Sequence, residues 1–160
     1  MIKTTIVCLG KLKEKYLIEA QAEYEKRLKN VSHLNIIEIE PERLGEKPSE
    51  AEIKKALDSE AKKILSKIPG GAYKIALCIE GKQFDSVRFA QLLSRTATNG
   101  FGNVCFIIGS SYGLSDEIKS AADHQLSMSE MTFPHQLARI MLLEQIYRAY
   151  KINNGGTYHK

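Results

Sequence analysis

The sequence predicts a single α/β domain, in which a parallel-type sheet carries helices on both faces. Two observations lead to this prediction. Apolar, β-branched runs alternate with helical patterns along the chain, which is typical of parallel strands joined by crossover helices. The 160 residues also suffice for one proper apolar core, and neither an internal repeat nor a second domain is visible. We therefore expect one domain over residues 1–160.

The first strand, the first helix and the second strand follow from the spacing of apolar residues. Residues 2–9 form a β-branched run that ends at Gly10. Apolar side chains then recur every three or four positions over residues 13–30, as on one face of a helix. Residues 34–40 alternate leucine and isoleucines with polar residues, which predicts a second strand that stops at Pro41.

The second helix begins at a capping box. In this motif the side chains of Ser49 and Glu52 each satisfy a backbone N–H that the helix leaves unpaired. The helix has one apolar face and ends at residues 69–71, which are Pro-Gly-Gly. Residues 74–80 then form a third strand, which we expect Gly81 to break.

Caps and apolar runs also define the elements that follow. Asp85 or Ser86 caps an amphipathic helix, and residues 104–108 form the most apolar strand of the chain. Ser115 caps a short helix, and residues 124–128 form a fifth strand. Strands and helices thus alternate throughout, which is the order expected for a parallel sheet.

The last helix, from Pro134 to about Ile152, is apolar in nearly every direction. The φ of Pro134 suits the first turn of this helix. The apolar side chains are Leu137, Ala138, Ile140, Met141, Leu142, Leu143, Ile146, Tyr147, Ala149 and Tyr150. A helix that is apolar all round must be buried all round. In a chain of this size we expect a homodimer whose partner subunit covers this helix. A central helix of a monomer is the alternative.

Two loops that follow apolar strands indicate a ligand site. The runs 106–114 and 126–135 each lead from a strand end into a helix start. Gly109 and Gly113 suit a backbone that turns sharply or lies against a ligand, although an ordinary tight turn fits them equally well. Such loops bind small ligands in open α/β sheets. With Leu77 from the third strand they predict an apolar pocket that suits an adenosine-containing ligand.

Missing motifs exclude several other functions. The chain has no GxxxxGK[ST] loop of a P-loop NTPase, no GxGxxG fingerprint and no GxSxG elbow. Cys8, Cys78 and Cys105 lie in apolar runs without metal-ligand spacing, so we expect reduced, buried thiols and no metal. No apolar run reaches the ~20 residues that a membrane span needs. We expect a cytoplasmic protein without a membrane partner.

Charged and aromatic residues near the carboxyl end are the candidates for chemistry. Glu144 and Arg148 share a helix face and by default form an ion pair, but Arg148 is also able to contact a phosphate or base carbonyls. In the tail, Tyr158 suits stacking on an unpaired base while Lys160 approaches a phosphate, although terminal segments are usually disordered. The net charge of +4, with Lys11 after the first strand, permits an RNA partner without requiring one.

Several motifs together carry a resemblance to a known family. They are Gly10-Lys11-Leu12-Lys13, Ile108-Gly109 through Gly113-Leu114, Leu126-Ser127, Met131-Thr132-Phe133-Pro134-His135, Glu144-Gln145-Ile146-Tyr147-Arg148-Ala149 and Tyr158-His159-Lys160. In this order the chain resembles the ribosomal RNA large subunit methyltransferase H family, which belongs to the SPOUT class. One position departs from the family pattern. Ser110 stands where the family usually has a glycine, and a positive φ there would strain a serine.

The resemblance implies a SPOUT fold with a deep trefoil knot in the carboxyl-terminal third, and a homodimer. It also implies methyl transfer from S-adenosylmethionine to N3 of a pseudouridine in the helix-69 loop of 23S rRNA, on assembled ribosomes. The residues implied to bind the donor are Leu77, Gly109, Met128, Ser129, Glu130, Met131, Thr132 and Phe133.

We expect catalysis to depend on positioning, because methyl transfer from a sulfonium is an in-line displacement. Arg148 is the candidate that stabilises the charge left on the base when N3 loses its proton. Glu144, His135 or His159 accepts that proton, directly or through water. The residues expected to hold RNA are Tyr158, His159, Lys160 and Lys11.

Two other functions stay open. A non-catalytic RNA-binding or ribosome-associated module of the same fold would not bind S-adenosylmethionine. A small-molecule transferase would have no obvious use for the terminal Tyr-His-Lys.

Overall fold

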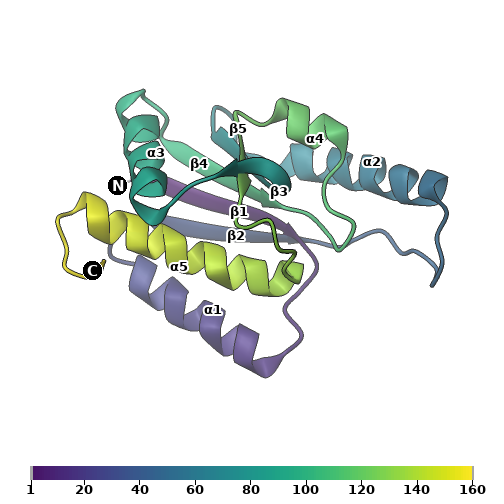
Figure 1. The fold of residues 1–160 in the computed structure, drawn as a ribbon, viewed down its shortest axis with the longest axis horizontal. Helices are drawn as coiled ribbons and strands as arrows, with labels where there is room; N and C mark the ends of the chain where they lie inside the picture. The colour runs from purple at the N-terminus through teal and green to yellow at the C-terminus, as the bar shows by residue number, and fades with distance from the viewer. Residues whose placement is uncertain (1, 160) are drawn as a thin grey trace.

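Five strands and five helices alternate along residues 2–159, the part of the chain that the structure, a computed structural model, describes (Figure 1). In chain order they are β1 (Lys3–Leu9), α1 (Lys15–Leu28), β2 (His33–Ile39), α2 (Glu50–Lys67), β3 (Tyr73–Gln83), α3 (Ser86–Thr98), β4 (Asn103–Ile108), α4 (Asp116–Ala121), β5 (His124–Ser127) and α5 (His135–Asn153). Each of the ten predicted elements is therefore confirmed to within a few residues.

The five strands form one sheet in the order β2-β1-β4-β3-β5, and every pair of neighbours is parallel. The central strands β1 and β4 are the most deeply buried, because helices cover them on both sides. Since all five strands run in the same direction, their carboxyl ends meet at one edge. The loops after β3, β4 and β5 therefore start from a common edge.

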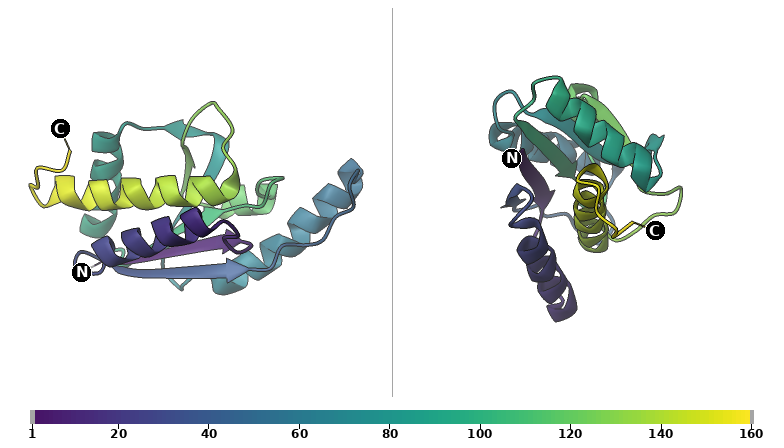
Figure 2. Two further views of the ribbon diagram at one scale, coloured as in Figure 1. Left: turned by 90° about the horizontal axis from the view of Figure 1, so that it is seen from below. Right: turned by 90° about the vertical axis from the view of Figure 1, so that its left-hand side faces the viewer.

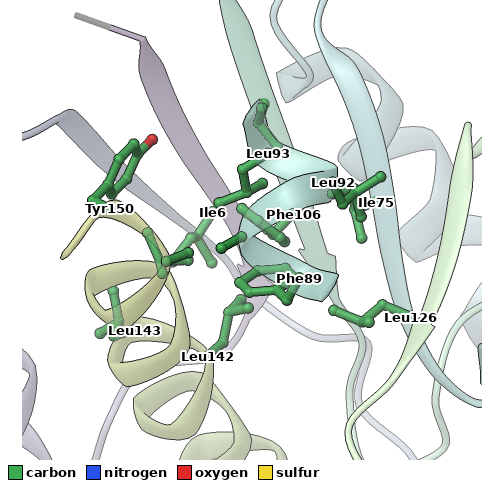
Figure 3. Close-up of a cluster of buried hydrophobic side chains, with 14 of the residues drawn as sticks. Ile6, Ile75, Phe89, Leu92, Leu93, Phe106, Leu126, Leu142, Leu143 and Tyr150 are labelled. Atoms are coloured by element: carbon green, nitrogen blue, oxygen red, sulfur yellow. The ribbon is translucent and has the colours of Figure 1, made fainter. Parts of the chain in front are cut away.

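Helices cover both faces of the sheet, as predicted. On one face, α1, α3 and α5 pack over a cluster that includes Ile6, Phe89, Phe106 and Leu142 (Figure 3). On the other face, α2 and α4 pack over a second cluster. Neighbouring residues of β1 point into opposite clusters, because side chains alternate along a strand. Within residues 2–159, no helix is both long and apolar enough to span a membrane.

The predicted caps are present. Ser49 and Glu52 form the reciprocal capping box at the start of α2, and Ser115 accepts a hydrogen bond from an N–H in the first turn of α4. Asp85 rather than Ser86 caps α3.

At α5 the prediction was one residue off: Pro134 lies outside the helix, with φ −54° and ψ 137°. Its φ fits a helix start, but its extended ψ makes it the residue that precedes the first turn.

The third strand is not broken at Gly81, contrary to the prediction. β3 continues to Gln83, and its pairing with β5 shifts instead: Leu77 and Lys82 both pair with Leu126. The residues between them bulge out of the ladder. A Cβ atom at Gly81 would lie 2.7 Å from the backbone carbon of Gln125, so the glycine permits close contact with β5 rather than ending the strand.

Helix α5 lies on the sheet between α1 and α3 (Figures 1 and 2). Six of its residues are buried: Arg139, Leu142, Leu143, Ile146, Ala149 and Tyr150. The chain itself therefore covers more of this helix than its nearly uniform apolarity suggested. Its outer side remains partly uncovered, and Leu137 is 38% exposed. The trefoil knot and the homodimer stay predictions.

Candidate functional site

A cavity of about 720 Å³ lies at the carboxyl edge of the sheet. Its walls come from the bulge of β3, the loop after β4, the segment after β5 and the first turn of α5. The cavity is lined by most of the residues predicted to bind the donor, namely Leu77, Gly109, Met128, Ser129, Met131, Thr132 and Phe133. The exception is Glu130, which is exposed to solvent and does not line the cavity.

The loop after β4 is shaped by its two glycines. Gly113 has a φ of +84°, which favours glycine. A Cβ atom on Gly109 would lie only 2.3 Å from the carbonyl oxygen of Gly113, so this position has no room for a side chain. Ser110 is free of the suspected strain, because no described residue other than glycine has a positive φ. It pairs with Gly113 across the turn, where the Gly113 N–H donates to its carbonyl at 2.8 Å.

A buried carboxyl group that sequence reasoning missed supports this loop from behind. Glu60 of α2 is only 4% exposed and accepts hydrogen bonds from the Ser110 hydroxyl at 3.3 Å and from the Glu42 N–H at 2.9 Å. Burial raises the pKa of Glu60. In the sequence it is one acidic residue among many on a helix, so no pattern singles it out.

The segment after β5 is held by its own serines. The Ser127 hydroxyl donates to the Ser129 carbonyl, and the Ser129 hydroxyl accepts from the Met131 N–H, both at 3.0 Å. These local hydrogen bonds form a turn without regular secondary structure. The turn places Met131 at the rim of the cavity, where it is 74% exposed.

The start of α5 carries His135 into the cavity and Arg139 into the protein. Burial lowers the pKa of His135, and the charges of Arg139 and Lys13 lower it further, so the imidazole is neutral near pH 7. Arg139 is 1% exposed and donates to Glu38 at 2.8 Å and to the Gly10 carbonyl at 2.9 Å. It thereby ties α5 to the carboxyl ends of β1 and β2.

A second group of predicted residues meets near the other end of α5. We call Glu144, Arg148, Tyr158 and His159 the tail cluster. Arg148 donates twice to Glu144, at 2.8 Å and 3.2 Å, and lies 3.2 Å from Nδ1 of His159. Tyr158 donates to Glu144 at 3.1 Å, and its ring lies 4.6 Å from the Arg148 guanidinium carbon. The tail therefore folds back on α5.

Within one chain, the tail cluster is separate from the cavity. His135 and Arg148 are thirteen positions apart on one helix, which corresponds to roughly 20 Å at the rise of an α-helix. A second cavity of about 550 Å³ adjoins the first, and Leu126, Ser127 and Met128 line both of them. This second cavity extends to His159. Lys11 is exposed in the loop after β1, and Lys160 lies outside the described residues.

The three cysteines are free thiols, as predicted, but they differ in burial. Burial raises the pKa of Cys8 to about 11 and that of Cys105 to about 12. Cys78 is half-buried and lines the larger cavity. Over residues 2–159, no three histidine, cysteine or acidic side chains group as metal ligands.

A comparison with protein families decides how this site is interpreted. The family model described as "Predicted SPOUT methyltransferase" matches residues 2–159. The chain belongs to this SPOUT methyltransferase family. It is an enzyme of the methyltransferase class, and its resemblance to ribosomal RNA large subunit methyltransferase H is confirmed by the relatives that follow.

Two relatives of this SPOUT methyltransferase match over nearly their whole length. A protein of Clostridioides difficile named "Ribosomal RNA large subunit methyltransferase H" is 51% identical over 156 residues, or 98% of each chain. A protein of the same name from Streptococcus uberis is 48% identical over 159 residues, which cover 99% of this chain and all of the relative.

Solved structures share the fold at low sequence identity. A probable methyltransferase from Bordetella pertussis aligns with a TM-score of 0.57 at 12% identity, covering 93% of this chain and 95% of that one. A probable methylase family protein from Haemophilus influenzae aligns with a TM-score of 0.55 over 72% of its length, also at 12% identity. At this identity the likeness concerns the fold alone.

Proposed function

We propose that this protein methylates 23S rRNA, transferring the methyl group of S-adenosylmethionine to N3 of a pseudouridine in the helix-69 loop of assembled ribosomes. The observation that carries the proposal is the convergence of the β3 bulge with the segments that follow β4 and β5 on one cavity. The relatives named ribosomal RNA large subunit methyltransferase H support rRNA as the substrate. A ribosomal substrate would place the protein in the cytoplasm.

The cavity residues fit an adenosine-containing donor. The volume of about 720 Å³ is within the usual range for small-molecule pockets, and the leucine, methionine and phenylalanine side chains offer apolar walls for a purine. Gly109 and its neighbours bring the backbone to the cavity surface, where main-chain groups are able to recognise the purine edge. The bound donor supplies an electrophilic methyl group. Leu77, Gly109 and residues 128–133 hold and orient this donor. Among them, Glu130 is the residue that does not line the cavity.

The tail cluster is the proposed acceptor side of the reaction. When N3 of the base loses its proton, negative charge spreads to the flanking carbonyl oxygens, and the Arg148 guanidinium is a preorganised donor for that charge. Tyr158, His159 and Lys160, with Lys11, hold the loop nucleotide by stacking and phosphate contacts.

The geometry supports His135 as the proton acceptor over the other two candidates. Glu144 already accepts hydrogen bonds from Arg148 and Tyr158. Nδ1 of His159 faces the Arg148 guanidinium, which only donates hydrogen bonds. Nδ1 therefore acts as the acceptor of this contact, and the ring proton is on Nε2. His135 is neutral and lines the donor cavity.

A homodimer is part of the proposal, because one chain keeps the two halves of the site apart. The partly uncovered outer side of α5, with Leu137 exposed, supports an interface there. In such a dimer the tail cluster of one subunit would face the donor cavity of the other.

Incubation with labelled S-adenosylmethionine and ribosomes from cells that lack the modification tests the proposal. We expect one labelled nucleotide, which mapping assigns to a helix-69 pseudouridine. Ribosomes should be modified and naked rRNA hardly at all, because a small protein makes few phosphate contacts. Label at another site, or equal labelling of naked rRNA, contradicts the proposal. If calorimetry detects no binding of S-adenosylmethionine, the non-catalytic RNA-binding alternative takes its place.

A further inference from the structure

Tyr24 on α1 makes the shortest hydrogen bond to the carboxylate of the tail cluster. Its hydroxyl donates to Oε2 of Glu144 at 2.7 Å. The sequence indicated only a packing role for this residue, on the apolar face of α1. The contact joins α1 to α5, so a helix far from the tail in sequence supplies a group to the tail cluster.

The donors around Glu144 fill its hydrogen-bonding capacity. Arg148 donates to Oε1 twice, Tyr158 lies 3.1 Å from both oxygens, and Tyr24 donates to Oε2. A carboxylate offers about four lone-pair sites, so little capacity is left for substrate. Glu144 therefore acts on Arg148, whose guanidinium it holds through two hydrogen bonds that converge on Oε1.

The two tyrosines that share Glu144 are anchored differently. Tyr158 lies in the exposed tail beyond α5. Tyr24 is half-buried in the middle of α1, and the Arg27 guanidinium carbon lies 5.3 Å from its ring centre. Burial and the hydrogen bond to Glu144 raise the pKa of Tyr24 to about 12, so its hydroxyl stays a donor at physiological pH.

We propose that Tyr24 is a positioning residue, which keeps Glu144 and Arg148 assembled when the tail leaves α5 to hold RNA. This inference rests on the proposed function, in which Arg148 acts on the acceptor base and Tyr158 binds the nucleotide. As the Tyr158 hydroxyl leaves, Glu144 loses one donor and Tyr24 remains. The guanidinium then keeps its orientation while its face, which the Tyr158 ring covers in this structure, becomes free for substrate.

Kinetics on ribosomes give the first test. We expect Tyr24→Phe to lower kcat about tenfold, as for loss of a hydrogen bond to a charged group. KM and Kd for S-adenosylmethionine should not change, since the donor cavity is elsewhere. In a Glu144→Met background, the same substitution should add little, because methionine already lacks the oxygen that accepts from Tyr24. Tyr16→Phe, at a 67% exposed position of α1, is the matched control. Unchanged kcat, or equal losses of kcat and donor affinity, would overturn the inference.

Nuclear magnetic resonance gives a second test that needs no activity. The Arg148 Nε–H resonance of labelled protein is assigned by its disappearance in Arg148→Lys. Deletion of residues 158–160 should leave this resonance dispersed, whereas the deletion combined with Tyr24→Phe should move it to the position of exposed arginines. If the resonance keeps its dispersed position when the deletion is combined with Tyr24→Phe, Tyr24 does not position Arg148. If wild-type protein does not methylate ribosomes, the proposed function fails, and this spectrum still decides how Arg148 is held.

Discussion

Gly109 and Arg148 have different roles in the proposed function, because one shapes the cavity and the other offers a charge. Gly109 matters because it has no side chain: its backbone packs against the Gly113 carbonyl, where a Cβ atom has no space. Arg148 matters because of its charged guanidinium, which contacts the carboxylate of Glu144 and the imidazole of His159. Substitutions at these residues should therefore have separable effects, one on donor binding and one on turnover.

Gly109→Ala should weaken donor binding while the fold survives. The added methyl group would force apart the two strands of the turn, and overpacking of this kind typically costs about 1–3 kcal/mol. Titration calorimetry with S-adenosylmethionine measures the loss, which we expect to be roughly ten- to a hundredfold in Kd. Gly102→Ala is the control, because no atom lies within 4 Å of a Cβ there. Equal affinities of the two variants would mean that the turn does not shape the cavity.

Arg148→Ala should abolish most methylation and spare donor binding. Removal of one donor that stabilises transition-state charge typically costs about 10²–10³ in rate. The cavity residues do not include Arg148, so calorimetry should give an unchanged Kd for S-adenosylmethionine. Parallel loss of methylation and donor binding would reassign Arg148 to a structural role.

Helix α5 links the proposed donor cavity to the sheet, and the buried Arg139 is one of its anchors. The guanidinium reaches Gln21 on α1, Glu38 on β2 and the carbonyl of Gly10 after β1. One side chain thus ties α5 to the ends of two strands and to the middle of α1. The rigidity of the first turn of α5, and with it the place of His135, depends on these contacts.

Arg139→Met should destabilise the protein by about 1–3 kcal/mol, because it leaves the partly exposed Glu38 carboxylate and the Gly10 carbonyl without their donor. Urea unfolding followed by circular dichroism measures this change. Arg88→Met removes an exposed pair with Asp85, at 3.9 Å, and should change stability by less than about 0.5 kcal/mol. A similar small change for Arg139→Met would show that the buried contacts contribute little net stability.

Strand β5 makes stability depend on pH through His124. Burial, and then the charges of Lys82 and Arg95, lower the pKa of His124 below its ordinary value of 6.5. The unfolded chain therefore binds a proton more readily, and stability contributed by the neutral ring is lost as the pH falls below about 6.5. His124→Phe keeps the stacking on Phe84, whose ring centre lies 5.2 Å away, and removes the titration.

Thermal unfolding at pH 7.5 and pH 5.5 tests this pH dependence. We expect Tm to fall less between these pH values in His124→Phe than in wild type. An identical fall in both proteins would assign the acid sensitivity to other groups.

The order and type of the elements could be predicted because they follow from local patterns. The capping box at Ser49, the cap at Ser115 and the apolar run of β4 act within a few residues. Gly81 shows where local patterns fail. Its role is set by the backbone of β5, which is far away in sequence, so a glycine that looks like a strand breaker instead permits close pairing.

For the molecule as a whole, the site divides into a part that sequence predicted and a part that it did not. The cavity at the carboxyl edge of the sheet was predicted because parallel strands place their following loops at one edge, and its use for the donor stays a proposal. Glu60 and Tyr24 were missed, since each reaches the site from a helix whose own pattern indicates only packing or solvation. Only tertiary structure brings such side chains to a distant loop or carboxylate.

Mixing two impaired variants, at a donor concentration well below the Kd of Gly109→Ala, tests whether each site combines two subunits. Gly109→Ala has an intact tail cluster, and Arg148→Ala has an intact donor cavity. In mixed dimers, one composite site would contain only wild-type halves, so random pairing should restore about a quarter of wild-type activity. Methylation of ribosomes after refolding the variants together measures the recovery. No recovery, with mixed dimers demonstrated by tagged subunits, would place the whole site in one chain.

The unequal burial of the three thiols has a practical consequence. Alkylating reagents react with thiolates, so the deeply buried Cys8 and Cys105, with their high pKa, should resist them. Burial raises the pKa of Cys78 as well, but this thiol is only half-buried and lines the larger cavity, where a reagent is able to reach it. The natural chain therefore has a built-in footprinting probe: the rate at which iodoacetamide modifies Cys78 should drop when a small molecule fills the cavity. Occupancy could then be followed by mass spectrometry without ribosomes, radioactivity or engineered labels.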